Sequence, residues 1–183
     1  MGERKNNMLV TNIIKRQKIK YLAAIVSVLV LVACATYDGR DLKPGEDSLE
    51  NVLQIMGNPA KRWQNADGTI QLAYPHGPMG YQTYMVFIAK DGKLGHIENV
   101  MDQKYFARIL PGMTQDEVLY ILGPSYPNWT VYFEKRDELV WEWRYCDIWN
   151  EAARFNVLFD NTKGTVRSTL SRTESCGIVS CKC

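Results

Sequence analysis

Residues 110–124 specify a short helix with a marked beginning and a marked end. Thr114 is a typical N-cap, and Glu117 three positions later completes a capping box, in which each residue's side chain bonds the other's backbone N–H. Gly123 can adopt the left-handed conformation that ends a helix, and Pro124 prevents the helix from continuing. The apolar residues between these ends fall on one face at helical spacing: Val118, Ile121 and Leu122.

The same pattern of an N-cap residue, apolar positions, a glycine and a proline occurs 66 positions earlier in the chain, in residues 42–59. When Gly57 is aligned with Gly123, Ser48 takes the N-cap position of Thr114. The apolar pairs that then align are Val52 with Val118, Leu53 with Leu119, and Ile55 with Ile121. Because caps, glycine and proline all recur together, the sequence predicts an internal repeat.

Each copy of the repeat is predicted to be a helix followed by an antiparallel meander of three to four strands, which is an α+β fold. In the first copy, residues 42–102, we expect the helix Ser48–Met56 and strands at Lys61–Trp63, Thr69–Tyr74, Tyr81–Ala89 and Leu94–Val100. In the second copy, residues 103–174, we expect a bridging helix at Gln103–Ile109 before the capped helix. Its strands are expected at Trp129–Glu134, Leu139–Tyr145, Arg154–Asp160 and Thr165–Ser171, with a loop at Trp149–Ala153.

The N-terminal residues 1–33 have the composition of a signal peptide. Six Lys and Arg side chains precede an apolar run at Tyr21–Val32. A run of 12 residues is too short to span a bilayer, which takes roughly 20 residues. The chain could start at Met1 or at Met8.

The apolar run ends in Leu31-Val32-Ala33-Cys34, which resembles a bacterial lipobox. The resemblance implies cleavage before Cys34, lipidation of its thiol and acylation of its amino group, with residues 34–41 as a lipidated tether. Several acyl chains anchor a protein stably, whereas one binds only marginally. The resemblance also implies that Ala35 in the next position, rather than Asp, favours sorting to the outer membrane. The alternative is an uncleaved short anchor with an incidental cysteine.

The order of elements, together with residues 111–124, Trp141–Tyr145 and Val157–Asp160, resembles the SmpA/OmlA, or BamE-like, lipoprotein family in two tandem copies. This resemblance implies an outer-membrane lipoprotein on the periplasmic face, with an accessory role in the assembly of β-barrel proteins. The tandem layout is also similar to that of β-lactamase inhibitory protein, in which two such units present a sheet to a partner. A shared layout says little about the partner itself.

The chain shows no motif for catalysis, a cofactor or a metal. Its two histidines, His76 and His96, have no Ser, Cys or carboxylate at motif spacing, and a catalytic site at the His76 loop ranks last. Without residues 1–33, 16 basic and 19 acidic residues leave a formal charge of −3, which argues against nucleic-acid binding. We therefore expect a protein that is not an enzyme.

Four cysteines besides Cys34 lie near the C-terminus, three of them in residues 175–183: Cys146, Cys176, Cys181 and Cys183. In an oxidising periplasm they can form two disulfides in three alternative pairings. The C-terminal cysteines are expected to close the tail on itself or onto Cys146. A soft-metal site in the tail is the alternative.

Aromatic residues in the second copy suggest an interaction surface. Trp141 and Trp143 share a strand face with Leu139 and Tyr145, and core packing explains them best. The candidate partner face is formed by residues with less constraint: Trp129, Tyr132, Glu142, Arg144 and Trp149.

These observations predict a lipid-anchored, non-enzymatic interaction module. Its partners would be outer-membrane lipids through acylated Cys34 and an envelope protein, with barrel-assembly components as the first candidates. The alternative is a periplasmic inhibitor or binding protein for an enzyme, and the partner's identity discriminates between the two functions.

Overall fold

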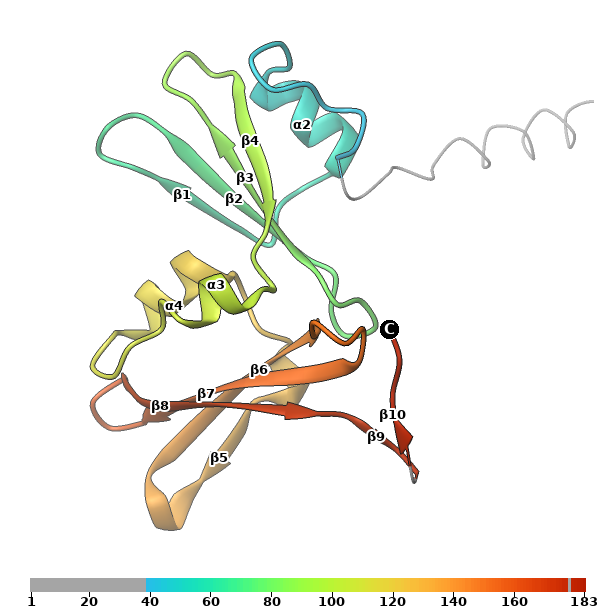
Figure 1. Cartoon of the computed structure of the whole chain (residues 1–183). Helices are drawn as coiled ribbons and strands as arrows, with labels where there is room; N and C mark the ends of the chain where they lie inside the picture. Colours follow the sequence, from blue (N-terminus) through green and yellow to red (C-terminus); the bar gives the residue numbers. More distant parts are fainter. Residues whose placement is uncertain (1–38, 178) are drawn as a thin grey trace, which may run out of the picture. The chain divides into compact units, whose positions relative to one another are not determined.

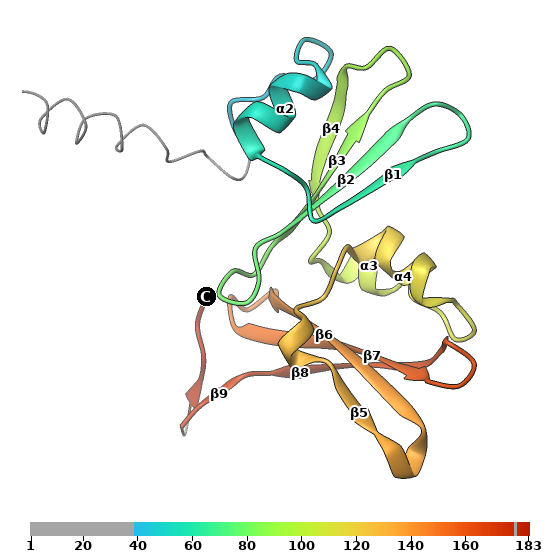
Figure 2. The same cartoon turned by 180° about the vertical axis from the view of Figure 1, so that it is seen from behind.

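The structure, a computed structural model, describes residues 39–177 and 179–183. Within them the fold is α+β, with a few short helices and two four-stranded antiparallel sheets (Figure 1 and Figure 2). The expected signal peptide of residues 1–33, the proposed lipidation site Cys34 and residues 35–38 of the tether lie outside the described residues. In the described part of the chain, no helix is long and apolar enough to cross a bilayer.

The first sheet follows helix α2 (Leu49–Met56) and takes its strands in sequence order. These strands are β1 (Lys61–Gln64), β2 (Ile70–Pro75), β3 (Thr83–Ile88) and β4 (Leu94–Asn99). Ser48 caps α2 and forms a capping box with Asn51. Helix and sheet share a buried core: Leu42, Val52, Met56, Leu72, Tyr74, Val86, Ile88 and Leu94.

The second sheet also follows the order of the sequence, and two helices precede it. The helices are α3 (Gln103–Phe106) and α4 (Gln115–Leu122), and the strands are β5 (Val131–Phe133), β6 (Glu138–Cys146), β7 (Ala152–Asp160) and β8 (Thr165–Thr173). Thr114 and Glu117 form the predicted capping box of α4. Beyond β8, a short hairpin of β9 (Ser175–Cys176) and β10 (Val179–Ser180) ends the chain.

Helix α4 contacts both sheets. Its buried face lies in one core with Trp143 and Phe155 of the second sheet and with Ala73 and Met85 of the first. The side-chain amide of Gln71 on β2 donates to the backbone carbonyl of Tyr120 over 2.6 Å. The alternation in residues 69–74 predicted one buried face, but Gln71 and Ala73 on the other face are buried as well, because α4 covers it.

The same set of backbone hydrogen bonds occurs in each half, where it joins the segment at the helix start to the region of the fourth strand. Both N-cap residues form a β-bridge there, Ser48 with Lys93 and Thr114 with Thr165. Three bonds of the first half have counterparts in the second. Leu49 N–H donates to Gly92 O, as Gln115 N–H donates to Gly164 O. Leu94 N–H donates to Asp47 O, as Val166 N–H donates to Met113 O. Gly45 N–H donates to Leu94 O, as Gly112 N–H donates to Val166 O.

Four further local predictions differ from the structure. Helix α3 ends at Phe106 rather than Ile109, because Arg108 and Ile109 donate to carbonyls three residues back and tighten the turn. The strand expected at Trp129–Glu134 is limited to β5, with 3₁₀ turns at Pro127–Trp129 and Glu134–Arg136 on either side. Ala152 and Ala153, expected in a loop, are buried in β7.

The fourth difference concerns the helix ends. Gly57 and Gly123 both have positive φ, 77° and 72°, but their ψ values of −164° and 178° are extended rather than left-handed helical. This region of backbone conformation is essentially restricted to glycine.

Candidate functional site

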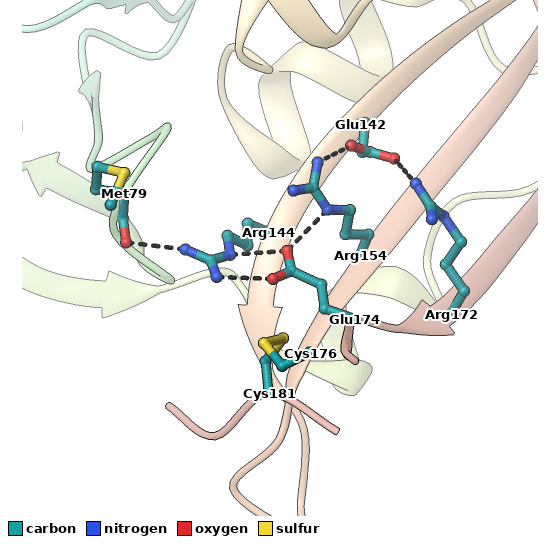
Figure 3. Close-up of polar contacts among 8 residues, drawn as sticks. All are labelled: Met79, Glu142, Arg144, Arg154, Arg172, Glu174, Cys176 and Cys181. Atoms are coloured by element: carbon teal, nitrogen blue, oxygen red, sulfur yellow. Dashed lines mark hydrogen bonds and ion pairs between the residues drawn. A yellow bond between two sulfur atoms is a disulfide. The ribbon is translucent and has the colours of Figure 1, made fainter. Parts of the chain in front are cut away.

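Three arginines lie side by side across the second sheet, on the face that points away from the helices. Arg144 of β6 is opposite Arg154 of β7, which is opposite Arg172 of β8. Like charges in directly opposite positions destabilise a sheet. Two glutamates, Glu142 and Glu174, alternate with the arginines and compensate this repulsion (Figure 3). We call these five residues the arginine row.

The contacts of the arginine row are short and partly shielded from water. Arg144 donates from Nε and Nη2 to the two carboxylate oxygens of Glu174, at 2.8 and 2.7 Å, in a bidentate pair. Arg154 Nε donates to Glu174 over 2.7 Å and its Nη1 to Glu142, while Arg172 donates to the second oxygen of Glu142 over 2.9 Å. The glutamate side chains are 8% and 12% exposed, so these charges depend on their partners.

These contacts determine the protonation states of Glu174 and Arg144. Burial opposes the charged form of Glu174, but the hydrogen bond from Arg144 and the positive charges of Arg154 and Arg144 outweigh it and lower the pKa of Glu174 below 4.5. The hydrogen bond to Glu174 raises the pKa of Arg144. The pair is therefore fully charged at neutral pH.

Arg144 also connects the row to the first sheet. Its Nη1 donates to the backbone carbonyl of Met79 in the β2–β3 loop over 3.3 Å, and its guanidinium lies 4.3 Å from the ring centroid of Tyr81. In the middle of the row, the guanidinium of Arg154 lies 4.1 Å from the ring centroid of Trp129, a cation–π arrangement.

The five residues of the predicted partner face therefore lie at three separate places on the second half. Trp129, Glu142 and Arg144 meet at the arginine row, where the charged groups bind one another. Tyr132 lies on β5, its hydroxyl donates to Asp137 over 3.0 Å, and that bond raises the tyrosine pKa. Trp149 lies in the loop between β6 and β7, which we call the Trp149 loop (residues 147–151).

The Trp149 loop exposes two large apolar side chains. Ile148 is 83% exposed and Trp149 is 73% exposed. Sequence reasoning singled out Trp149 but missed Ile148, although the apolar pair between two predicted strands, next to Asp147 and Asn150, was the available signal. Two adjacent exposed apolar side chains are more informative than a single one, because contiguous apolar patches mark interaction sites.

Hydrogen bonds fix the conformation of this loop. The Asp147 carboxylate accepts the backbone N–H groups of Trp149 and Glu151 over 2.8 and 2.9 Å, and Asn150 adopts a positive φ of 57°. The C-terminal residues also contact the loop. Glu151 pairs with Lys182 over 2.8 Å, and Asn150 O accepts the N–H of Cys183.

Disulfides connect this region covalently. Cys146, the last residue of β6, pairs with Cys183, and Cys176 pairs with Cys181 across the β9–β10 hairpin. This is one of the three pairings that the sequence left open. Both bonds lie at the end of the second sheet that carries the Trp149 loop.

The two histidines lie in the first half, His76 in the β2–β3 loop that contacts Arg144 through Met79, and His96 on β4. His96 stacks on Phe87 and contacts Glu98 over 2.9 Å, and His76 packs edge-on against Tyr84. Among the described residues, no group of three or more His, Cys, Asp or Glu side chains is arranged to hold a metal ion.

Comparisons with known proteins gave no neighbour for this chain. No protein-family model matches the sequence, and neither the curated proteins nor the solved structures contain a match. The α+β class with two four-stranded antiparallel sheets is therefore defined by the structure alone.

Proposed function

We propose that this protein is an outer-membrane lipoprotein, anchored through acylated Cys34 on the periplasmic face. In this proposal it is a non-enzymatic module that binds a protein partner and supports β-barrel assembly or envelope integrity. The lipobox-like sequence at residues 31–34 supports the anchor.

We further propose that the described part consists of two BamE-like units in tandem. The order of one capped helix and four antiparallel strands occurs twice. The matching bridges of Ser48 with Lys93 and of Thr114 with Thr165 support a common origin for the halves, because a chance resemblance of sequence would not reproduce them.

The observation that carries the binding function is the exposed pair Ile148 and Trp149 on a loop of fixed conformation. Tryptophan is enriched among the residues that dominate interface energies, and truncating such an anchor typically costs 2 kcal/mol or more. A loop that is already ordered loses little conformational entropy on binding, so more of the contact energy appears as affinity.

The experiment compares variants of the full-length chain in the envelope. The double substitution of Ile148→Ser and Trp149→Ser should reduce the proteins that co-purify after crosslinking by about tenfold or more, the equivalent of losing one anchor. Leu110→Ser is the matched control, because Leu110 is 57% exposed and lies outside the loop. An unchanged set of co-purified proteins in the folded double variant would refute the assignment.

The anchor is tested separately by mass spectrometry of the mature N-terminus. Acyl groups on Cys34 are expected, and Cys34→Ser should release the chain from membranes. A mature chain that begins at another residue and carries no acyl group would refute this part while leaving the binding function open to its own test.

The same loop geometry also fits the alternative function of an enzyme inhibitor, since a fixed apolar tip suits a cleft. Identification of the crosslinked partner separates the two proposals. Barrel-assembly components support the first function, and a soluble periplasmic hydrolase supports the second.

A further inference from the structure

Strand β8 is an open edge of the second sheet. It is the last strand in the order β5-β6-β7-β8, and it is nine residues long, whereas β5 at the other edge has three. Residues 167–173 are exposed without interruption. Native proteins usually protect such an edge by shortness, charged side chains, proline or a bulge. Strand β8 has no lysine or proline, its bulge lies near its start, and its two arginines, Arg167 and Arg172, pair with Asp160 and Glu142 of the same sheet.

The backbone groups that point outward from this edge follow from the pairing. Glu174 N donates to Ala152 O, so position 174 faces β7, and in an antiparallel strand every second residue shares that direction. The N–H and C=O groups of Thr169, Ser171 and Thr173 therefore point away from β7.

The beginning of the edge is already covered. Val166 N donates to Met113 O and Val166 O accepts from Gly112 N, at 2.8 Å each. A β-bulge separates Val166 from Ser168. The free portion is consequently limited to residues 168–173, and its outward groups are centred on Ser171.

We propose that this edge pairs with the β8 edge of a second copy of the chain, antiparallel about a two-fold axis at Ser171. The limited free portion selects this register, because an axis at Thr169 would bring Thr173 of one copy against the covered start of β8 in the other. The inference does not depend on the proposed function of the Trp149 loop.

The side chains in this register are self-complementary. Ser171 lies opposite Ser171 of the second copy, and Thr169 lies opposite Thr173 of the second copy, both favourable hydroxyl pairs. On the other face, Leu170 lies opposite Arg172 of the second copy, so the aliphatic stem of Arg172 covers a leucine that is 55% exposed. No two arginines are directly opposed.

The resulting dimer is expected to be weak in solution. The contact consists of one short strand pair, well below the roughly 1,200 Å² that stable interfaces bury. Confinement of many copies at one surface would raise their effective concentration and favour pairing.

The test places a cysteine on the two-fold axis. In a hydrogen-bonded antiparallel pair the Cα atoms are about 5.5 Å apart, within the range that a disulfide spans. Under mild oxidation, full-length Ser171→Cys should form a covalent dimer at least about tenfold faster than Thr169→Cys, whose position faces Thr173 rather than itself. Equal rates, or no dimer from Ser171→Cys, would overturn the register.

A second pair of variants separates association from folding. Ser171→Pro removes an outward N–H and should abolish the concentration-dependent dimer in sedimentation without changing the unfolding midpoint by more than a few degrees. Arg172→Pro removes a bond to β7 and should destabilise the fold itself. If the Ser171→Cys chain links in cells to a different protein and not to itself, the edge serves another partner and the proposal is wrong.

Discussion

Trp143 donates its indole N–H to the backbone carbonyl of Gly123, which ends helix α4, over 3.2 Å. The first half contains the same arrangement, because the hydroxyl of Tyr74 donates to the carbonyl of Gly57, which ends helix α2, over 3.1 Å. In both halves an aromatic side chain of the second strand thus donates a hydrogen bond to the carbonyl of the glycine that ends the helix. Carbonyls at a helix C-terminus lack partners within the helix.

Substitution of the two helix-ending glycines should have unequal effects. Both Gly57→Ala and Gly123→Ala place a side chain at positive φ in a region that costs about 1–3 kcal/mol. A Cβ at Gly57 meets nothing within 4 Å, whereas one at Gly123 would lie 3.0 Å from Thr83 and 3.3 Å from Ala73 and Met85. Gly123→Ala should therefore lower the free energy of unfolding by at least ~1 kcal/mol more than Gly57→Ala.

Denaturant unfolding of the two variants measures this difference directly. Equal destabilisation would mean that the space between Gly123 and the first sheet accommodates a Cβ, contrary to the 3.0 Å approach to Thr83.

The aromatic hydrogen bonds are tested by Tyr74→Phe and Trp143→Phe. Tyr74→Phe removes one hydroxyl and should cost about 0.5–1.5 kcal/mol. Trp143→Phe removes the N–H and also shrinks a side chain that is 3% exposed, so it should cost about 2 kcal/mol or more. Thermal unfolding should rank the variants in this order, and a more stable Trp143→Phe protein would contradict the bond to Gly123.

The arginine row should make the free energy of unfolding depend on pH in the acidic range. The pKa of Glu174 is lowered in the folded protein, because the hydrogen bond from Arg144 and the nearby positive charges outweigh the effect of burial. The unfolded chain therefore binds more protons below pH 4.5, and the stability that Glu174 contributes above this pH is lost as the pH falls through its folded-state pKa. Glu174→Gln should be less stable than wild type at pH 7 and should lose less stability on acidification.

Urea unfolding at pH 7 and at decreasing pH values below 4.5 checks the sign. Glu46→Gln is a suitable control, because Glu46 pairs with Lys43 at an exposed site where the side chain is 73% accessible. Parallel pH profiles for wild type and Glu174→Gln would show that Glu174 does not contribute this dependence.

The two disulfides should contribute unequally to stability. Cys146–Cys183 closes 37 positions of chain and Cys176–Cys181 closes five. By loop entropy, removal should cost up to about 4 kcal/mol for the first pair and about 2 kcal/mol for the second. Cys146→Ser with Cys183→Ser should also increase amide exchange in the Trp149 loop, whereas Cys176→Ser with Cys181→Ser should leave exchange there unchanged.

Local patterns predicted much of the fold. Ser48, Thr114 and Glu117 identified the helix starts, and the alternation from Leu139 to Tyr145 identified β6, because these signals depend on neighbours in the sequence. The burial of Gln71 could not be predicted, since it depends on a carbonyl 49 positions away, at Tyr120. Ala152 and Ala153 have weak intrinsic strand preference, and pairing with β6 decides their conformation.

The candidate site was less predictable than the fold. Trp149 was identified as a surface residue of interest, but the fixed conformation of its loop depends on Cys183 and Lys182, more than 30 positions away. The sequence placed Glu142 and Arg144 on a common face, yet it gave no sign that Glu174, beyond the predicted strand, pairs with Arg144. Contacts between distant segments therefore set the chemistry of this surface.

Site-specific photo-crosslinking in living cells tests the central claim most directly. A photoreactive residue at position 149 of the full-length chain should yield one predominant protein adduct, whereas the same residue at position 110, also exposed, should not. The adduct should disappear when Ile148→Ser is added. Crosslinks to lipid alone, or equal adducts from both positions, would contradict the account that this protein acts by binding a partner through the Trp149 loop.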